Sequence, residues 1–175
     1  MTRRPSGGGE QRSRSASKRR LGREMALQML YQREMGGVTT PQVLLNYNPV
    51  DLLEALRDDP EEVLVRLSGQ PEQMREALLY ARRLVEGATA HLEELDGMIR
   101  EQAENWRLER MSAVDRNVLR LAVYELLYES DVPKLVVLDE AIELAKRFGS
   151  EQSGRFVNGL LDGLLRSQHF PGSLS

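Results

Sequence analysis

The residues best suited to a chemical task lie close together near the N-terminus of the chain. Arg19, Arg20 and Arg23 are spaced i, i+1 and i+4, so on a helix their guanidinium groups cover one patch. Lys18 precedes them, and Tyr31, eleven residues after Arg20, lies only about 20° from the same helical line. Guanidinium groups bind phosphates and aromatic rings stack on bases, so the pattern favours single-stranded nucleic acid. The alternative is a charged helix end with Tyr31 half in the core.

A second group of candidate residues lies in the segment RFVNG, residues 155–159. Glycine in a helix interior costs up to about 1 kcal/mol, so Gly154, Gly159 and Gly163 indicate close backbone approach or a loose helix end. Phe156 is either a core residue or a ring available for stacking, and the sequence leaves both readings open.

Groups for catalysis or metal binding are scarce. The chain has no cysteine, which excludes a disulfide scaffold, a thiolate metal site and a cysteine nucleophile. It has only two histidines, His91 and His169, and neither an HExxH motif nor a glycine-rich phosphate loop. The carboxylates beside His91 and the pair Asp139-Glu140 are expected to be solvated. We therefore expect no enzyme, no cofactor and no metal site.

The charge of the chain is divided unevenly. Its 175 residues carry 24 Lys and Arg against 27 Asp and Glu, a net charge of −3. Residues 1–23 hold eight basic residues and one acid, a net charge of +7, which leaves −10 for residues 24–175. A cationic arm on an acidic body indicates a polyanionic partner approached from one end. No secretory signal or membrane-spanning run is present, so we expect a cytoplasmic protein.

The elements that position these residues are all expected to be helices. Residues 1–17 are rich in Arg, Ser and Gly and are expected to form a disordered arm, with Ser17 capping the first helix. No run of alternating β-branched residues supports a strand. Apolar periodicity and proline or glycine boundaries predict an all-α chain of about seven helices, over residues 17–35, 49–57, 60–67, 71–104, 113–128, 136–148 and 152–167.

Three segments resemble a known family when they are read together. They are RRLGREMALQMLYQ, NWRLERMSAVDRNVLRLAVYELLY and DVPKLVVLDEAIELAKRFGSEQSGRFVNGLLDGL. Their order and spacing are similar to the NusB family of transcription antitermination factors, over about residues 18–35 and 80–166. The resemblance implies one helical domain over residues 18–168, with subdomains at about 18–104 and 105–168 and a tail at 169–175.

The resemblance also implies a function. Members bind the boxA segment of ribosomal RNA operon transcripts together with the small-subunit ribosomal protein NusE. They join RNA polymerase and other Nus factors, suppress premature termination and catalyse no reaction. Carried over by position, the RNA-binding residues are Lys18, Arg19, Arg20, Arg23, Tyr31, Phe156 and Asn158, and the partner-binding residues are Asp115, Arg116 and Arg120.

The chain departs from the family pattern in a longer basic arm, an expanded segment 36–70 and the turn SEQSG before Phe156. Two other classes of function remain open at this point. One is a helical protein-interaction module whose basic arm is incidental, and the other is a hydrolase that uses glutamate and histidine.

Overall fold

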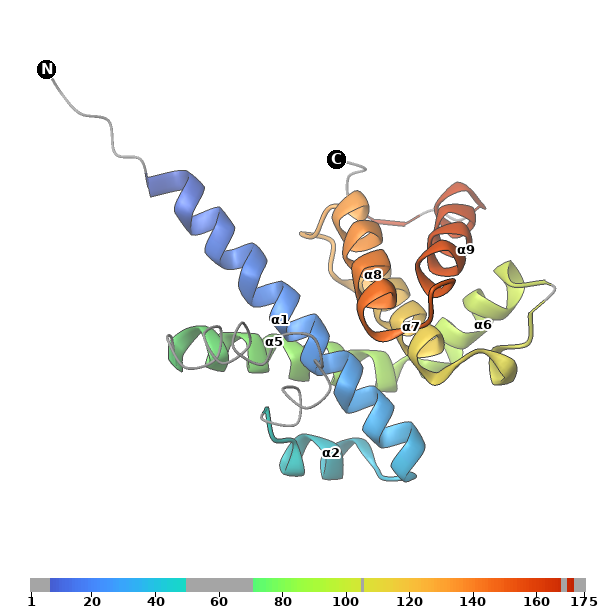
Figure 1. The fold of residues 1–175 in the computed structure, drawn as a ribbon, viewed down its shortest axis with the longest axis horizontal. Helices are drawn as coiled ribbons and strands as arrows, with labels where there is room; N and C mark the ends of the chain where they lie inside the picture. The colour runs from blue at the N-terminus through green and yellow to red at the C-terminus, as the bar shows by residue number, and fades with distance from the viewer. Residues whose placement is uncertain (1–6, 50–70, 105, 168–169, 172–175) are drawn as a thin grey trace, which may run out of the picture.

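The computed structural model describes residues 7–49, 71–104, 106–167 and 170–171. Within these ranges the chain forms helices and no strand (Figure 1), which confirms the all-α prediction. Two predicted helices, 49–57 and 60–67, fall almost wholly outside the described residues. The helices are α1 (Gly7–Gly36), α2 (Thr40–Asn46), α5 (Pro71–Ala90), α6 (Leu92–Gln102), the 3₁₀ turn η1 (Leu108–Arg110), α7 (Ala113–Tyr128), α8 (Lys134–Phe148) and α9 (Ser153–Ser167).

Helix α7 is the centre of the molecule. All ten residues from Asn117 to Leu126 are buried, because α1, α5, α6, α8 and α9 all pack against this helix. A helix that is buried on every side belongs to the interior of a protein. One hydrophobic cluster takes side chains from all the described helices. The division into subdomains at about residue 104 stays a prediction.

The first helix is longer than expected. It begins at Gly7, so the predicted start at Ser17 is wrong, and residues 7–17 belong to this helix rather than to a disordered arm. Once a helix is nucleated, each further residue adds a hydrogen bond at little cost, and a composition poor in apolar residues does not prevent this extension. The helix approaches α5 closely at Gly22, where a Cβ atom would lie 2.9 Å from the carbonyl oxygen of Ala77.

The predicted helix 71–104 is wrong as a single element. It is broken at His91, whose φ of −112° and ψ of 22° separate α5 from α6. The His91 ring stacks on Tyr128 of α7 at a centroid distance of 4.3 Å, so the break is stabilised by a tertiary contact. Apolar periodicity continues across the break, which is why the pattern alone did not indicate it.

Several helix boundaries follow local signals. Helix α7 has the predicted bounds, 113–128, and the backbone N–H of Asp115 donates to Ser112 Oγ at 3.1 Å, which caps its start. Helix α9 agrees with its prediction within a residue, and α8 begins at Lys134, two residues early. Helix α2 was missed, although Thr39 and Gln42 form the reciprocal capping box that marks its start.

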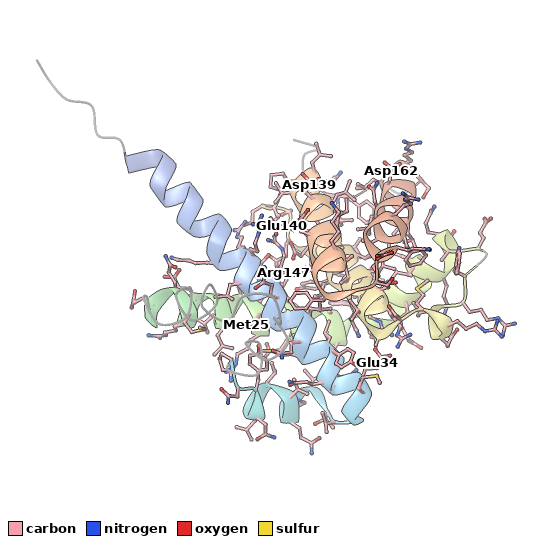
Figure 2. The ribbon with its side chains drawn as sticks, viewed as in Figure 1. Met25, Glu34, Asp139, Glu140, Arg147 and Asp162 are labelled. Carbon is pink, nitrogen blue, oxygen red and sulfur yellow. The ribbon has the colours of Figure 1, made fainter. Side chains whose placement is uncertain are left out.

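Helix α1 is joined to α8 by polar contacts. Figure 2 shows Glu140 and Arg147 on the flank of α8 that faces α1. Glu140 accepts hydrogen bonds from Arg20, and Arg147 donates one to Glu24 at 2.7 Å. Since α8 also packs along α9, it lies between α1 and α9. The two groups of candidate residues therefore lie on helices separated by α8.

Candidate nucleic-acid interface

The four cationic side chains of α1 that the sequence predicts to bind RNA are each paired with a carboxylate. The four acids come from different elements, so these pairs tie α1 to much of the body. The pairs are Lys18 with Glu76 of α5, Arg19 with Asp131 after α7 at 2.8 Å, Arg20 with Glu140 of α8 at 2.9 Å, and Arg23 with Glu125 of α7 at 2.7 Å.

These pairs differ in burial, and the difference decides which of them a ligand can reach. Arg23 is only 4% exposed and Glu125 only 2%. Burial alone would lower the pKa of Arg23, but the hydrogen bonds and charge of Glu125 outweigh it and raise the pKa. Arg23 is thus a permanent interior cation, and the prediction that it shares one surface patch with Arg19 and Arg20 is wrong. By contrast, the Arg20 side chain is 52% exposed. The three side chains that solvent reaches, Lys18, Arg19 and Arg20, are called the α1 cationic patch below.

Tyr31 is not a core residue. It is 39% exposed on α1, and Met35 at i+4 and Val38 just beyond the helix are exposed as well. Residues spaced i and i+4 share one face of a helix. Tyr31 therefore begins a short apolar strip at the C-terminal end of α1, away from the cationic patch at residues 18–20.

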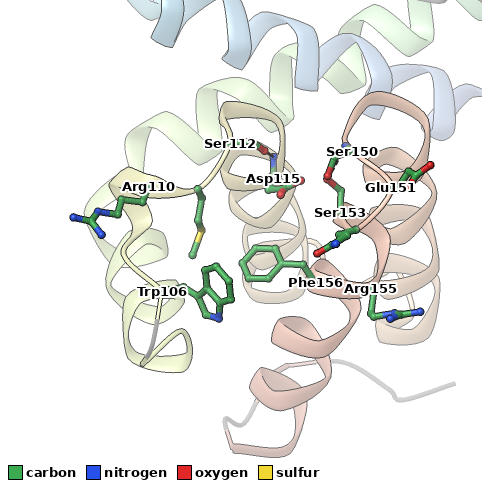
Figure 3. Close-up of a pocket in the computed structure, with 11 residues that line it drawn as sticks. Trp106, Arg110, Ser112, Asp115, Ser150, Glu151, Ser153, Arg155 and Phe156 are labelled. Carbon is green, nitrogen blue, oxygen red and sulfur yellow. Dashed lines mark hydrogen bonds between the residues drawn. The ribbon is translucent and has the colours of Figure 1, made fainter.

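Phe156 lies in a groove that the sequence analysis did not foresee. The groove has a volume of about 620 Å³ and lies between η1, the start of α7 and the start of α9 (Figure 3). Trp106 meets Phe156 edge to face, with ring centroids 5.8 Å apart and an angle of 65° between the planes. Arg110 and Arg155 flank the two rings. Phe156 packs against the core on one side and lines the groove on the other.

Trp106 is the functional candidate that the sequence analysis missed. It is 63% exposed and is the only tryptophan in the chain. It follows α6 in a junction without helical periodicity, so no pattern assigned it to a face. A single tryptophan in such a junction was the available signal, since buried rings normally occur within a periodic element.

The glycines of α9 differ from one another. A Cβ atom at Gly154 would lie 2.8 Å from Lys146 Cγ, and one at Gly163 would lie 2.1 Å from Gln102 Nε2, so close approach is confirmed at both positions. At Gly159 a Cβ atom would meet nothing within 4 Å, and the residue lies inside α9, so neither close backbone approach nor a loose helix end explains this glycine. Asn158 beside it is exposed. Lys146 in the last turn of α8 and Arg155 in the first turn of α9 are exposed cations.

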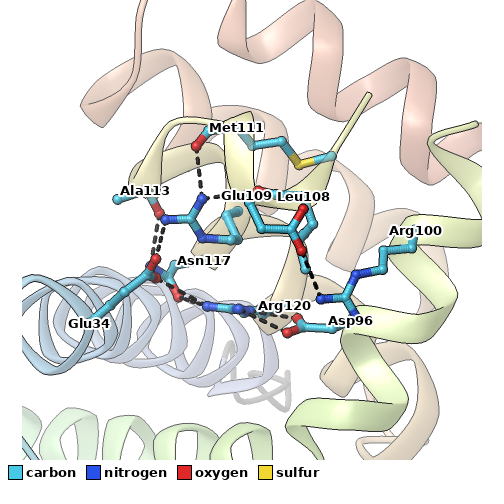
Figure 4. Close-up of polar contacts among 10 residues, drawn as sticks. Glu34, Asp96, Arg100, Leu108, Glu109, Met111, Ala113, Asn117 and Arg120 are labelled. Carbon is cyan, nitrogen blue, oxygen red and sulfur yellow. Dashed lines mark hydrogen bonds and ion pairs between the residues drawn. The ribbon is translucent and has the colours of Figure 1, made fainter. Parts of the chain in front are cut away.

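Two of the three residues predicted to bind a partner, Arg116 and Arg120, belong to an internal network (Figure 4). Arg120 donates to both carboxylate oxygens of Asp96 at 2.7 and 2.9 Å and to Glu34 at 3.1 Å. Arg116 donates to Glu34 and to the carbonyl oxygens of Leu108 and Met111. Both guanidinium groups are therefore used to fasten α1, α6 and α7 together.

Two acidic residues of this region, Glu34 and Asp115, lie in different environments: Glu34 belongs to the network and Asp115 lines the groove. Burial alone would raise the pKa of Glu34, but its hydrogen bonds from Arg116 and Asn117 outweigh this and lower it. Asp115 lines the groove beside Phe156, so among the three predicted partner residues it is the one that faces an open groove.

The described residues contain no cluster of three or more acidic or histidine side chains that could hold a metal ion. No helix among them is long and apolar enough to cross a membrane.

The fold and the candidate interface define a class: an all-helical protein with exposed cations on one helix and an aromatic groove on another. The sequence model of the NusB family matches residues 20–166, and the chain belongs to that family. It is 46% identical to the Transcription antitermination protein NusB of Myxococcus xanthus over 145 residues, 82% of this chain and 91% of that protein. The NusB family is a family of transcription antitermination proteins and not an enzyme family.

Solved structures agree with the assignment. A structure of NusB from T. maritima is similar at a TM-score of 0.62 and 38% identity, covering 86% of this chain and 92% of that one. A crystal structure described as antitermination factors NusB and NusE in complex with dsRNA is similar at a TM-score of 0.61 and 28% identity. It covers 86% of this chain and 98% of that one.

Proposed function

We propose that this chain is a cytoplasmic transcription antitermination factor that binds boxA-type single-stranded RNA of ribosomal RNA operon transcripts together with NusE. Through this complex it acts on RNA polymerase with other Nus factors, and it uses no cofactor. Membership of the NusB family and the solved complex of a relative with NusE and RNA support the assignment. The single observation that carries it is the exposed Trp106 set against Phe156 in an arginine-flanked groove.

The proposed mechanism divides the work between two surfaces. The α1 cationic patch binds phosphates and fixes the position of the RNA, while the groove provides stacking and edge contacts to unpaired bases. Arg110 and Arg155 line the groove and offer cations to the phosphates beside the stacked bases.

The partner surface is proposed at the other end of α1. Tyr31 and Met35 are exposed there, and the network of Glu34, Arg116 and Arg120 holds this end of the helix rigidly against α7. Asp115 offers a carboxylate nearby, in the groove. We assign Arg116 and Arg120 a positioning role. Tyr31, predicted from the sequence to bind RNA, is proposed here to contact the basic ribosomal protein together with Asp115.

The test is a binding titration with a fluorescent single-stranded boxA-type RNA and a scrambled RNA of equal composition. Each titration is run at two salt concentrations, with and without NusE. We expect salt-dependent binding that favours the boxA sequence. Binding of NusE with no binding of either RNA would instead support the protein-interaction module, and binding of neither would contradict the proposal.

A further inference from the structure

The exposed arginines of the α1 cationic patch are already occupied by carboxylates. Arg20 donates through Nε and Nη2 to both oxygens of Glu140 at 3.1 and 2.9 Å, and Arg19 donates through Nη2 to Asp131 at 2.8 Å. A guanidinium binds carboxylate and phosphate with the same pair of donors. Arg20 therefore cannot grip a phosphate with this edge while Glu140 holds it.

We infer that Asp131 and Glu140 compete with RNA phosphates for Arg19 and Arg20. In the free protein the two carboxylates hold the guanidinium groups in place, and on binding the phosphates replace them. The inference rests on the proposed function and assigns Asp131 and Glu140 a role in setting RNA affinity. No bond is made or broken in this exchange, since only ion pairs change partners.

Burial explains why these two pairs can exchange and the neighbouring one cannot. The side chains of Arg19 and Asp131 are 35% and 63% exposed, and those of Arg20 and Glu140 are 52% and 15% exposed, so water and salt reach both pairs and weaken them. Removing Glu125 from Arg23 would instead leave a charge buried without a partner. Of the arginines on α1 that the sequence singled out, Arg19 and Arg20 are therefore the exchangeable ones.

The competition has a consequence for selectivity. Every polyanion that uses the patch must displace both carboxylates, so each exposed pair weakens binding by about two- to fivefold. An anion that makes only one contact with the patch gains too little free energy to displace the two carboxylates. A ligand that also stacks its bases in the distant groove gains enough to do so.

The test compares carboxylate-to-amide variants in RNA titrations. Asp131→Asn and Glu140→Gln should each tighten binding of the boxA-type RNA by about two- to fivefold. The slope of log affinity against log salt should stay unchanged, because the number of neutralised phosphates is the same. Thermal unfolding of each variant checks that the fold is kept.

Glu143→Gln is the matched control. Glu143 lies on the same helix three residues after Glu140, and its charge also acts on Arg20, but it pairs with Lys146 at 3.6 Å. The substitution Glu143→Gln therefore removes a negative charge that repels RNA near Arg20, but it releases no guanidinium group. In an Arg20→Ala background, Glu140→Gln should lose its advantage over Glu143→Gln.

The outcomes separate this inference from the proposed function. If the unaltered protein binds RNA, but Glu140→Gln and Asp131→Asn tighten binding no more than Glu143→Gln does, the competition is wrong and the function stands. If the unaltered protein and the amide variants all fail to bind RNA, the proposed function is wrong and the inference falls with it.

Discussion

Arg23 of α1 and Glu125 of α7 form a two-fold hydrogen-bonded ion pair inside the protein, 102 positions apart in the sequence. Nε donates to Oε1 at 2.7 Å and Nη2 to Oε2 at 2.9 Å. The Tyr80 ring lies against the guanidinium group, 5.7 Å from Cζ to the ring centroid. The pair fixes α1 against the central helix and thereby sets the direction in which Arg19 and Arg20 face solvent.

Arg23→Ala should destabilise the protein by about 3–5 kcal/mol, because Glu125 is left charged and buried without its partner. Urea unfolding measures the change. Arg20→Ala is the control: the Arg20 side chain is 52% exposed, so its pair with Glu140 should contribute only about 0–1 kcal/mol. Equal, small losses for both variants would show that the Arg23 pair does not support the fold.

Phosphate contacts are counted by the salt dependence of RNA binding. Replacing both Arg19 and Arg20 by alanine should lower the slope of log affinity against log salt by about 1.4, since each phosphate on a single strand contributes about 0.7. The matched control replaces Arg100 and Arg166, which are exposed and paired with Glu109 at 3.1 Å and with Asp162 at 3.0 Å. Equal slopes for the two double variants would contradict a role for the patch.

Stacking in the groove is tested at Trp106. Trp106→Ala should weaken RNA binding by about 1–3 kcal/mol. Its effect on stability should be only about 1 kcal/mol, the value of an aromatic pair, because the ring is largely exposed. Because Trp106 is the only tryptophan in the chain, the tryptophan fluorescence of the protein comes from this ring alone, and it should be quenched when RNA stacks on the ring. Unchanged fluorescence during saturating RNA binding would move the stacking site elsewhere.

Local signals predicted much of the fold. The Ser112 cap and the apolar periodicity of α7 and α9 depend on residues within one turn of each other, and their boundaries were predicted within a residue. The break at His91 depends on a ring of α7, and the Arg23–Glu125 pair joins distant segments. Such contacts leave no periodic trace in the sequence, so the sequence could not supply them.

The same distinction applies to the candidate site. The exposed Arg19, Arg20 and Tyr31 were found because their spacing on one helix is a local property. Arg23 follows the same spacing, but its burial depends on where α7 packs. Likewise, Arg120 looks like a surface cation until Asp96 of α6 is placed opposite it. Spacing predicts which residues share a helix face, and only packing shows which face meets solvent.

The Glu34 network should make stability depend on pH. Its pKa is lowered from the ordinary value of 4.5, so the folded state favours the carboxylate. The resulting stabilisation is present above about pH 4.5 and is lost as the pH falls through the lower folded-state value. Urea unfolding between about pH 6 and pH 3 should show a smaller loss for Glu34→Gln than for the unaltered protein. Glu93→Gln, on an exposed position of α6, should retain the full loss.

RNA and the ribosomal protein should bind cooperatively. The chain beyond residue 23 carries a net charge of −10 and repels RNA except near its exposed cations. A basic partner at the Tyr31 strip and Asp115 would relieve this repulsion and extend the cationic surface. We expect a coupling of about 1–3 kcal/mol, or roughly 5- to 150-fold, and linkage requires that RNA tighten partner binding by the same factor.

Isothermal titration of each ligand with and without the other closes this cycle. The variant Tyr31→Ser should weaken binding of the partner while leaving the affinity for RNA alone unchanged, because Tyr31 lies away from the cationic patch. In that variant the partner should therefore tighten RNA binding only at higher partner concentrations. Independent affinities for the two ligands at about 0.15 M salt, where charges farther apart than about 8 Å are largely screened, would contradict a shared surface.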